Sequence, residues 1–561
     1  MKKYGKLTAV ALIALLVGSM ATACGGGGID DSTEEINADM TQLYVSNYNG
    51  GFGDAWLQAL KKEFEELYAE RSFESDKKGV QVIIDNHKAS DSALAGVKNS
   101  RNMVYFIQGE YYPSATQGLF ADITDIVVEG GDNSIESRLS AGQKAYWTAH
   151  AGKYYALPRA EAVYGLTYDI DLFEEYSLYF AKDGVPTEAN WGGTYKYTAM
   201  GEKATGPDGL YNTSDDGLPA TYADLFVLFD RMAEKGVIPL TWTGWYYTYY
   251  LNWLQQAMAI DYEGYEQGSM LFSYNGTAKN LVQSIQENEN TLFDTLTFKE
   301  PTTVTLENGY EMFNSAGRYY ALKVMEKIMS NTKYYDYNNC FNGTVSHTDA
   351  QDNFLYSSFD NKPIGLLVEG SWWLGEASST FKDMEVYGYG KKDRRFALMP
   401  LPKVDGSKLG PATYCNTEAS LAFVNSNLSG EKLKLAKEFL KFAYSEKSMQ
   451  DFTMYTDAAL CLDYDLTDEQ YENLTTFGKS LWNIHKGEGG AKVVHKTDLN
   501  PAVITQQGKL DLRGTFYTKI GGNTYNVAVD VFRKKTVTAA EFFKGISTLY
   551  SKDWWSANIL L

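Results

Sequence analysis

Hydrophobic residues near the start of the chain group into short runs separated by amphipathic stretches. Three apolar runs have the length and the β-branched content of buried strands: 41–46, 79–84 and 103–107. The stretch after the first run repeats apolar residues at helical spacing on one expected face: Leu57, Leu60, Phe64 and Leu67. Asp54 stands where it can cap this helix, and a shorter helix is expected over 90–98. The resulting β-α-β-α-β order predicts an α/β fold with a largely parallel, doubly wound sheet.

The predicted sheet and the residue pattern also indicate two ligand-facing loops and two later helices. In a doubly wound sheet, ligands lie beyond the carboxyl ends of the strands, so the loops 47–51 and 108–112 are expected to face a site. Residues 431–444 carry one apolar stripe, which predicts a packing helix. Thr538 and Glu541 form a capping-box pair that is typical of the start of another helix.

The stretch 241–253 has a high density of aromatic side chains. Its Trp and Tyr residues are Trp242, Trp245, Tyr246, Tyr247, Tyr249, Tyr250 and Trp253. Each pairs an apolar face with a polar tip, which suits a ligand that is apolar on one face and carries hydroxyl groups at its edge. A pyranose ring is such a ligand. The alternative is a buried helix whose rings fill a core, and the stretch alone does not decide between the two.

Length and charge narrow the class of protein. A chain of 561 residues is too long for a single compact core, so two large lobes or domains are expected. Hydrophobic residues make up 44% of the chain and aromatic residues 14%, which indicates a globular protein. The formal net charge of -20 would repel nucleic acid, polyanionic substrates and an anionic membrane surface. A neutral ligand is therefore favoured.

The first residues have the composition of a targeting segment. Residues 1–23 begin with lysines and continue with an apolar segment that ends in small residues, which predicts a secretion signal peptide. Its end, Met20-Ala-Thr-Ala-Cys24, resembles a bacterial lipobox, and this implies that Cys24 becomes lipidated. Residues 24–38 would form a flexible tether to the membrane, held by acyl chains that contribute about 0.8 kcal/mol per buried CH₂. Cleavage and free secretion is the alternative.

Disulfide and transition-metal chemistry have little support in the sequence. The mature chain would keep three cysteines without a CxxC spacing, and the histidines show no HExxH pattern. One insertion, 206–217, offers oxygen donors among turn-forming glycines: Asp208, Asn212, Asp215 and Asp216. These residues suit a structural calcium ion, although they do not follow the EF-hand spacing. A solvated surface hairpin is the alternative, and no other cofactor is expected.

Several short motifs in a fixed order resemble a known family. The motifs are GLFADIT at 118–124, GKYYALP at 152–158, LTYDIDLF at 166–173, PIGLLVEGSWW at 363–373 and FALMPLP at 396–402. In this order they resemble the extracellular solute-binding proteins of bacterial ABC importers. The most similar class is the carbohydrate-binding, maltose-binding-like one. The likeness covers most of residues 40–450.

The resemblance implies a hinged architecture. Two α/β lobes, each a doubly wound sheet flanked by helices, would be joined by strand crossovers and close on the ligand. The crossovers are expected near 153–159 and 413–420. Lobe 1 would comprise residues 39–155 and 416–460. Lobe 2 would comprise residues 160–412 and 461–561. Residues 462–535 match the family poorly, and the resemblance gives them no role.

The same resemblance implies a set of substrate-binding residues around the cleft between the lobes. They are Asn47, Tyr48, Glu110, Tyr111, Arg159, Glu161, Trp242, Trp245, Tyr246, Trp372, Trp373 and Asn416. The rings would stack on sugar faces, and the charged and amide groups would hydrogen-bond hydroxyl groups. Trp372 follows a strand and a glycine at the family's stacking position, whereas strict alternation would point Trp373 elsewhere.

The implied function is a membrane-anchored, non-enzymatic receptor. It would act as a monomer, capture a sugar or an oligosaccharide, and deliver it to an ABC transporter permease. A secreted glycoside hydrolase is one alternative, because Glu110, Glu161 and Glu369 are candidates for the two carboxyl groups that its chemistry needs. An oligopeptide-binding protein of an ABC importer is another, but the abundance of tryptophan fits sugars better.

Overall fold

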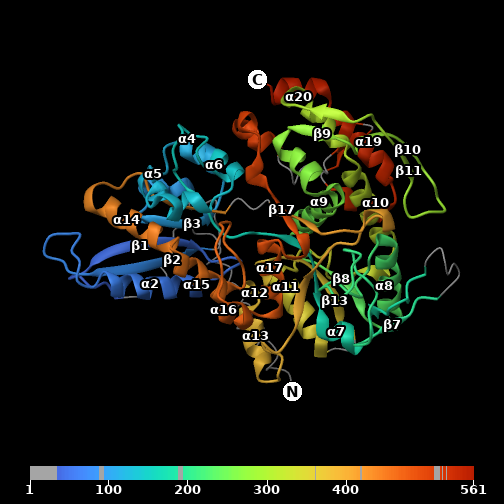
Figure 1. The fold of residues 1–561 in the computed structure, drawn as a ribbon, viewed down its shortest axis with the longest axis horizontal. Coiled ribbons are helices and arrows are strands. Elements are labelled where there is room, and N and C mark those ends of the chain that lie inside the picture. The colour runs from blue at the N-terminus through green and yellow to red at the C-terminus, as the bar shows by residue number, and fades with distance from the viewer. Residues whose placement is uncertain are drawn as a thin grey trace, which may run out of the picture.

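The computed structural model folds into two lobes that lie side by side (Figure 1). Each lobe has its own central sheet. The structure describes residues 35–87, 94–186, 194–359, 362–416, 420–510, 518–520, 522–525 and 527–560. The predicted signal peptide, Cys24 and most of the predicted tether lie outside the described residues, as does part of the helix predicted over 90–98.

Lobe 1 holds a five-stranded sheet in the order β2-β1-β3-β16-β4. Its strands are β1 (Thr41–Tyr48), β2 (Val80–His87), β3 (Val104–Gln108), β4 (Leu157–Pro158) and β16 (Ser420–Val424). β1 is parallel to both β2 and β3, so the predicted parallel order is confirmed. β16 is antiparallel to β3 and β4, and it brings a strand from late in the sequence into the sheet.

The helices of lobe 1 come from both ends of its sequence. They are α2 (Ala55–Leu67), α4 (Tyr111–Thr116), α5 (Thr124–Val128), α6 (Ala141–Trp147), α14 (Gly430–Ala443) and α15 (Glu446–Thr456). Leu67 is 64% exposed because α2 ends there, and Trp56 packs in the core instead. The Asp54 carboxylate accepts hydrogen bonds from Gln58 and Asn86 rather than capping the helix.

Lobe 2 holds a four-stranded sheet in the order β14-β5-β13-β8. Its strands are β5 (Tyr164–Asp169), β8 (Ile238–Thr241), β13 (Ile364–Gly370) and β14 (Phe396–Met399). β13 is parallel to β8, but β13 and β14 are both antiparallel to β5. This sheet is therefore mixed, because the strand that enters from the hinge runs against its neighbours.

Helices and short ribbons surround the second sheet. The longest helix, α9 (Tyr247–Ser273), bends at Gly264 and packs against α10. The other helices are α7 (Ile170–Glu175), α8 (Tyr222–Glu234), α10 (Ala316–Ser330), α11 (His347–Tyr356), α12 (Trp373–Glu376), α13 (Ser378–Glu385), α17 (Thr476–Lys486), α18 (Ala528–Lys534), α19 (Ala539–Leu549) and α20 (Lys552–Asn558). The ribbon strands are β6 (Tyr179–Phe180), β7 (Tyr197–Thr198), β9 (Gly276–Ala278), β10 (Val282–Gln286), β11 (Thr295–Phe298), β12 (Thr302–Val304), β18 (Thr518–Ile520) and β19 (Asn523–Tyr525). The predicted capping box opens α19. Among the described helices, none has both the length and the hydropathy that a membrane span requires.

In the part of the chain that the structure describes, three connections lead from one lobe to the other and form the hinge. The first joins β4 to β5, the second joins β15 (Thr413–Asn416) to β16, and the third joins α15 to α17 through α16 (Asp468–Asn473). The first and third run side by side. The Glu161 N–H donates to the carbonyl of Ala459 at 2.8 Å, and the Cys461 N–H donates to that of Arg159 at 2.7 Å. The sequence prediction named only the first two as hinge crossovers, although its lobe boundary between 460 and 461 implies a third passage between the lobes.

A stretch near the C-terminus bridges the two lobes. β17 (Lys492–His495) pairs with β15, and the residues that follow it contact α6 of lobe 1 and α9 of lobe 2. The Asn500 N–H donates to the carbonyl of Phe272 in α9 at 3.1 Å. Helical turns over Pro501–Leu510 then contact α4 and α6. We call residues 492–510 the strap. It contacts both lobes, which corrects the assignment of all of 461–561 to lobe 2.

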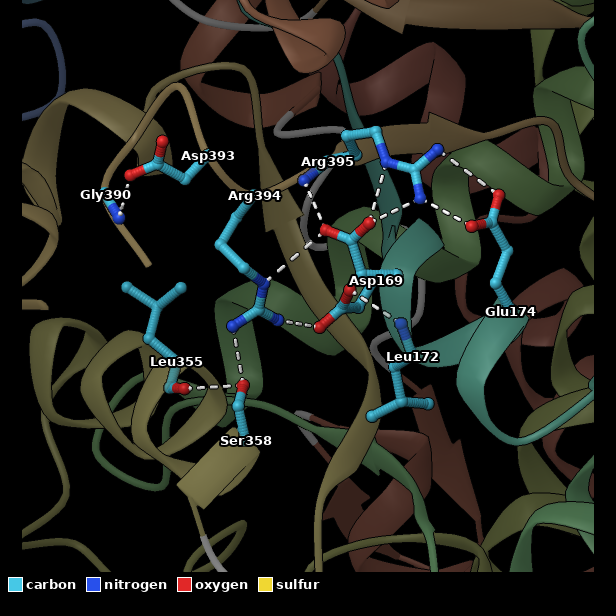
Figure 2. A network of polar contacts seen from close by, with 10 residues as sticks. Asp169, Leu172, Glu174, Leu355, Ser358, Gly390, Asp393, Arg394 and Arg395 are labelled. Atoms are coloured by element: carbon cyan, nitrogen blue, oxygen red, sulfur yellow. Dashed lines mark hydrogen bonds and ion pairs between the residues drawn. The ribbon is translucent and has the colours of Figure 1, made fainter. Parts of the chain in front are cut away.

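An ionic network fastens the outer end of the lobe 2 sheet (Figure 2). The buried guanidinium of Arg394 donates to the carboxylate of Asp169 and to the hydroxyl of Ser358. Asp169 also accepts the Leu172 N–H at the start of α7, and the neighbouring Arg395 pairs with two further carboxylates of that helix. The network ties β14 to β5 at the end of the sheet remote from the hinge.

Candidate ligand-binding site

The carboxyl ends of strands from both lobes meet at the lobe boundary. In lobe 1, β1 leads into the loop 48–53, and in lobe 2, β13 leads into α12 through Ser371 and Trp372. The Gly51 N–H donates to Oε1 of Glu376 across this boundary, at 3.0 Å. Sheets of this type bind ligands at the carboxyl ends of their strands, so the boundary is the expected place for a site.

Five aromatic side chains form a continuous series on the lobe 2 side of the boundary. We call them the aromatic ladder: Trp245, Tyr246, Tyr249, Trp253 and Trp372. The ring centroids of successive members lie 6.0, 6.5, 6.5 and 5.7 Å apart. The first three are exposed, at 60%, 38% and 49%, and the last two are partly buried. Three residues predicted to bind the ligand, Trp245, Tyr246 and Trp372, therefore belong to one surface.

Two other predicted tryptophans lie in the core of lobe 2. Trp242 is buried, and its ring contacts the ring of Tyr335. Trp373 is buried among phenylalanine rings, including that of Phe396. Trp373 follows Trp372 directly and begins α12, so it points away from the surface that its neighbour faces. The structure therefore places Trp242 and Trp373 in the core of lobe 2, away from the ladder, and not on the surface where the prediction expected them.

A buried cluster of polar side chains adjoins Trp372. Gln351 Nε2 donates to Oε1 of Glu369 at 3.0 Å and to Oε2 of Glu376 at 2.7 Å. Hydrogen bonds also join Tyr250 to Trp372 and to Glu369. Burial, followed by the negative charge of Glu376, raises the pKa of Glu369 well above its ordinary value. The cluster therefore holds a carboxyl group that favours its neutral form beside a second carboxyl group.

The backbones of the two lobes approach closely at two glycines. Gly51 has a φ of 78°, and a Cβ at this position would lie 3.0 Å from the Cβ of Trp372. A Cβ on Gly375 would lie 2.4 Å from the carbonyl oxygen of Gly51. His347 adds a contact, with Nε2 3.6 Å from Oε1 of Glu376. We call Gly51, Gly375 and Glu376 the clasp, because they hold the lobe 1 loop against Trp372.

Two predicted polar residues are enclosed by lobe 1. Asn47 is buried, and its Nδ2 donates to Oδ1 of Asn86 at 3.0 Å. Arg159 is 3% exposed, and its guanidinium lies 4.9 Å from the centre of the Trp56 ring. Burial lowers the pKa of Arg159 to about 10. In this structure these side chains lie at the root of the hinge, enclosed by lobe 1 and apart from the ladder. Tyr48 is partly buried at the start of the loop that carries the clasp.

Two further predicted residues pair with other side chains at the hinge. Oε2 of the buried Glu161 lies 2.8 Å from Nδ1 of His485. Burial opposes ionisation of Glu161, but the hydrogen bond and positive charge of His485 outweigh it and lower the pKa of Glu161. Asn416 Nδ2 lies 3.1 Å from Sγ of Cys461 and 3.4 Å from Nδ1 of His495. Both predicted residues therefore stabilise the chain crossings.

A small cavity lies between lobe 1, the hinge and the strap. It encloses about 20 Å³, enough for one water-sized group, and its lining includes Tyr111, Asn416 and Lys496. The buried Tyr111 donates its hydroxyl to the carbonyl of Trp147 at 2.6 Å. The Glu110 carboxylate lies 3.7 Å from Nζ of Lys496. The structure thus brings Tyr111 and Asn416 to one small cavity, and it places them apart from the ladder.

The loop 206–217 directs its carboxylates to its own backbone. Asp215 is buried and accepts the Asp208 N–H at 2.9 Å. Asp216 accepts the Asn212 N–H at 2.8 Å. Within the part of the chain that the structure describes, no three His, Cys, Asp or Glu side chains are grouped so that they could hold a metal ion. This arrangement is that of a hydrogen-bonded turn, and calcium binding stays a prediction.

Some residues of the site were missed in the sequence. Glu376 follows Trp372 by four residues, one helical turn, and this spacing was a usable signal. Gln351 and His347 belong to α11, and the sequence contains nothing that connects them with the ladder. The strap likewise comes from a region to which the resemblance gave no role.

Comparison with known proteins identifies the fold. No model of a protein family matches the chain, and no curated protein sequence matches it. A solved chitin oligosaccharide binding protein matches with a TM-score of 0.54 at 14% identity, over 92% of this chain and 100% of its own. The solute-binding protein RafE in complex with raffinose gives 0.51 at 13% identity, over 91% and 99%. Maltose-bound MalE3 of T. maritima also gives 0.51 at 13% identity, over 91% and 99%.

The chain therefore has the two-lobe α/β fold of solute-binding proteins. This confirms the predicted fold class and, at the level of fold, the resemblance that the short motifs indicated. The lobe boundary with its ladder and clasp lies between the two halves of that fold.

We expect the pair formed by Glu161 and His485 to make the stability of the hinge depend on pH. The folded-state pKa of Glu161 is below the ordinary value of 4.5, so its contribution is present above that pH and is lost as the pH falls through the lowered value. Glu161→Gln should reduce the free energy of unfolding at neutral pH by about 1.5–3 kcal/mol, the range for a hydrogen bond to a charged group. The difference in unfolding free energy between the variant and the unmodified protein should become smaller in acid. Urea titrations at several pH values measure it, with Glu110→Gln as the control at a partly exposed carboxylate. A difference that does not vary with pH would contradict the assignment.

We expect Gly375→Ala to open the clasp, because the new Cβ would lie 2.4 Å from the carbonyl oxygen of Gly51. Hydrogen–deuterium exchange should then be faster at the amides of the loop 48–53, where the Gly51 N–H loses its partner. Gly343→Ala is the matched control, since a Cβ there meets nothing within 4 Å. Equal protection of the loop in both variants would show that the clasp does not hold the lobes together.

Proposed function

We propose that this protein is the substrate-binding component of an ABC transporter. It captures a sugar or an oligosaccharide between its lobes and delivers it, chemically unchanged, to a membrane permease. The observation that carries the proposal is the aromatic ladder at the lobe boundary. Indole and phenol rings offer flat apolar faces with polar tips, and sugar rings combine an apolar face with hydroxyl groups at the edge.

The polar cluster behind the ladder supports recognition of hydroxyl groups. Glu369 favours its neutral form and can donate a hydrogen bond, whereas Glu376 and Gln351 offer acceptor and donor atoms beside it. A sugar hydroxyl both donates and accepts, so it can satisfy either kind of group. Oε1 of Gln351 is buried without a hydrogen-bond partner among the described residues, and a ligand without hydroxyl groups would leave it so, which is a source of specificity.

The hinge and the clasp supply the conformational part of the mechanism. A ligand that contacts both lobes binds the closed form better than the open form, and it therefore shifts the population toward closure. In the closed form the clasp brings the loop 48–53 against Trp372, at the inner end of the ladder. Release at the permease would require the clasp to open again.

The location of the protein follows from the same proposal. Lipidation at Cys24 would anchor the mature chain at the outer face of the cell membrane, and the tether would let a monomer reach both its ligand and the permease. The net charge of -20 favours a neutral ligand over a polyanion.

A glycoside hydrolase is the second candidate function, and one observation favours it. Glu369 and Glu376 are two carboxyl groups near the ladder, and one has a strongly raised pKa, as a general acid requires. Both oxygens of Glu369 already accept hydrogen bonds, from Gln351 and from the Gly370 N–H, and Glu376 binds the clasp. This pairing fits a recognition cluster better than two groups that flank a glycosidic bond.

We expect Trp372→Ala to weaken oligosaccharide binding by about tenfold or more, because the variant loses both a stacking face and the hydrogen bond to Tyr250. Tryptophan fluorescence titrations of the full chain with malto-, xylo- and chito-oligosaccharides measure the affinity. Trp554→Ala, which truncates another partly buried tryptophan in α20, is the matched control.

Undiminished affinity in the Trp372 variant would remove the residue from the site. Chromatography of the sugars after incubation separates the two candidate functions. Intact oligosaccharides are expected, and cleavage at a useful rate that is lost in Glu369→Gln would establish the hydrolase instead.

We propose that, if calcium binds this chain, the loop 206–217 is its site. The loop contains four oxygen donors, but its carboxylates already accept backbone N–H groups. Calcium would therefore have to displace these hydrogen bonds. The expected result is a melting temperature that rises by a few degrees with calcium and falls with a chelator. An identical melting temperature in both conditions would dismiss the site.

A further inference from the structure

The aromatic ladder extends beyond the point where the lobes touch. Trp372 lies at the clasp, Trp253 contacts it, and both are partly buried. Tyr249, Tyr246 and Trp245 continue the series, and each is exposed. The ladder thus joins partly buried rings at the lobe boundary to exposed rings at the start of α9.

The spacing of the ladder follows from helix geometry. Tyr249 and Trp253 are four residues apart on α9, which places them on one face and about 6 Å apart along the helix axis. Their ring centroids are 6.5 Å apart. The steps from Trp245 to Tyr246 and from Tyr246 to Tyr249 are 6.0 and 6.5 Å. Each step is comparable to the length of one pyranose unit in a linear oligosaccharide.

The outer end of the ladder is held in place by its own turn. The Trp245 N–H donates to the carbonyl of Val345 at 2.9 Å, and the Tyr246 N–H donates to the hydroxyl of Thr243 at 3.2 Å. A Cβ on Gly244 would lie 2.2 Å from a backbone carbonyl oxygen of the opposite loop, so only glycine permits this close packing. The exposed rings are therefore presented on a fixed backbone, which reduces the entropy cost of binding.

We propose that the ladder binds a linear oligosaccharide of at least four units. One end of the ligand lies at Trp372, inside the lobe boundary, and the rest leaves the boundary along α9 over Tyr249, Tyr246 and Trp245. This inference rests on the proposed function and extends it to the length and the path of the ligand. Continuity of the exposed rings with the site at the boundary favours a sugar chain over a second protein as the occupant.

The test is a dependence of affinity on chain length. Calorimetric titrations of the full chain use a series from disaccharide to hexasaccharide, taken from the malto-, xylo- or chito-oligosaccharide set that binds. Affinity should rise up to at least four units. Trp245→Ala should weaken binding of the hexasaccharide by about two- to tenfold and leave that of the disaccharide unchanged. Tyr387→Ala, which removes another exposed ring of lobe 2, should change neither.

The outcomes separate this inference from the proposed function. If sugars bind but the affinity is the same for two and for six units, or if Trp245→Ala weakens all lengths equally, the extended path is wrong and the proposed function stands. If the variant leaves every affinity unchanged but abolishes self-association of the chain, the outer rings serve a contact between copies. If no member of any series binds, the proposed function itself fails.

Discussion

The close contact between the two lobes at the clasp is the constraint on which the rest of the structure depends. Gly51 and Gly375 let two backbones approach to a distance that no side chain would permit, and Glu376 accepts the Gly51 N–H across the boundary. Each lobe has its own sheet and core, so their relative position rests on this contact, the hinge and the strap. Because the clasp lies against Trp372, closure of the lobes directly affects the ring at the inner end of the ladder.

The ladder and the polar cluster divide recognition between them. The rings provide apolar contact area without fixing the orientation of the ligand, and they tolerate any ligand with an apolar face. Gln351, Glu369 and Glu376 are buried or nearly so. A ligand that leaves a polar atom without a hydrogen bond there would lose binding free energy. Affinity is therefore expected to come mainly from the ladder, and specificity from the cluster. The remaining polar residues of the hinge, including Glu161 and Arg159, stabilise the crossings.

Much of the fold was predictable because it depends on local pattern. The first three strands of lobe 1 and their parallel order, and the capping box of α19, follow from apolar spacing and capping residues. The site was predictable only in part. Trp245 is exposed and Trp372 is partly buried at the lobe boundary, but Trp242 is buried by packing against residues far along the chain, which no local pattern reveals. The clasp and the strap arise from tertiary contacts. The spacing of Trp372 and Glu376 was a local signal for one part of the clasp, whereas the strap had no signature in the sequence.

The central claim is that the lobes close around a saccharide that remains intact. Small-angle X-ray scattering from the full chain, with and without a saturating oligosaccharide, tests it most directly. A smaller radius of gyration is expected in the presence of the sugar, since ligand contacts with both lobes favour the closed form. A sugar that binds without any change in the radius of gyration would contradict the account.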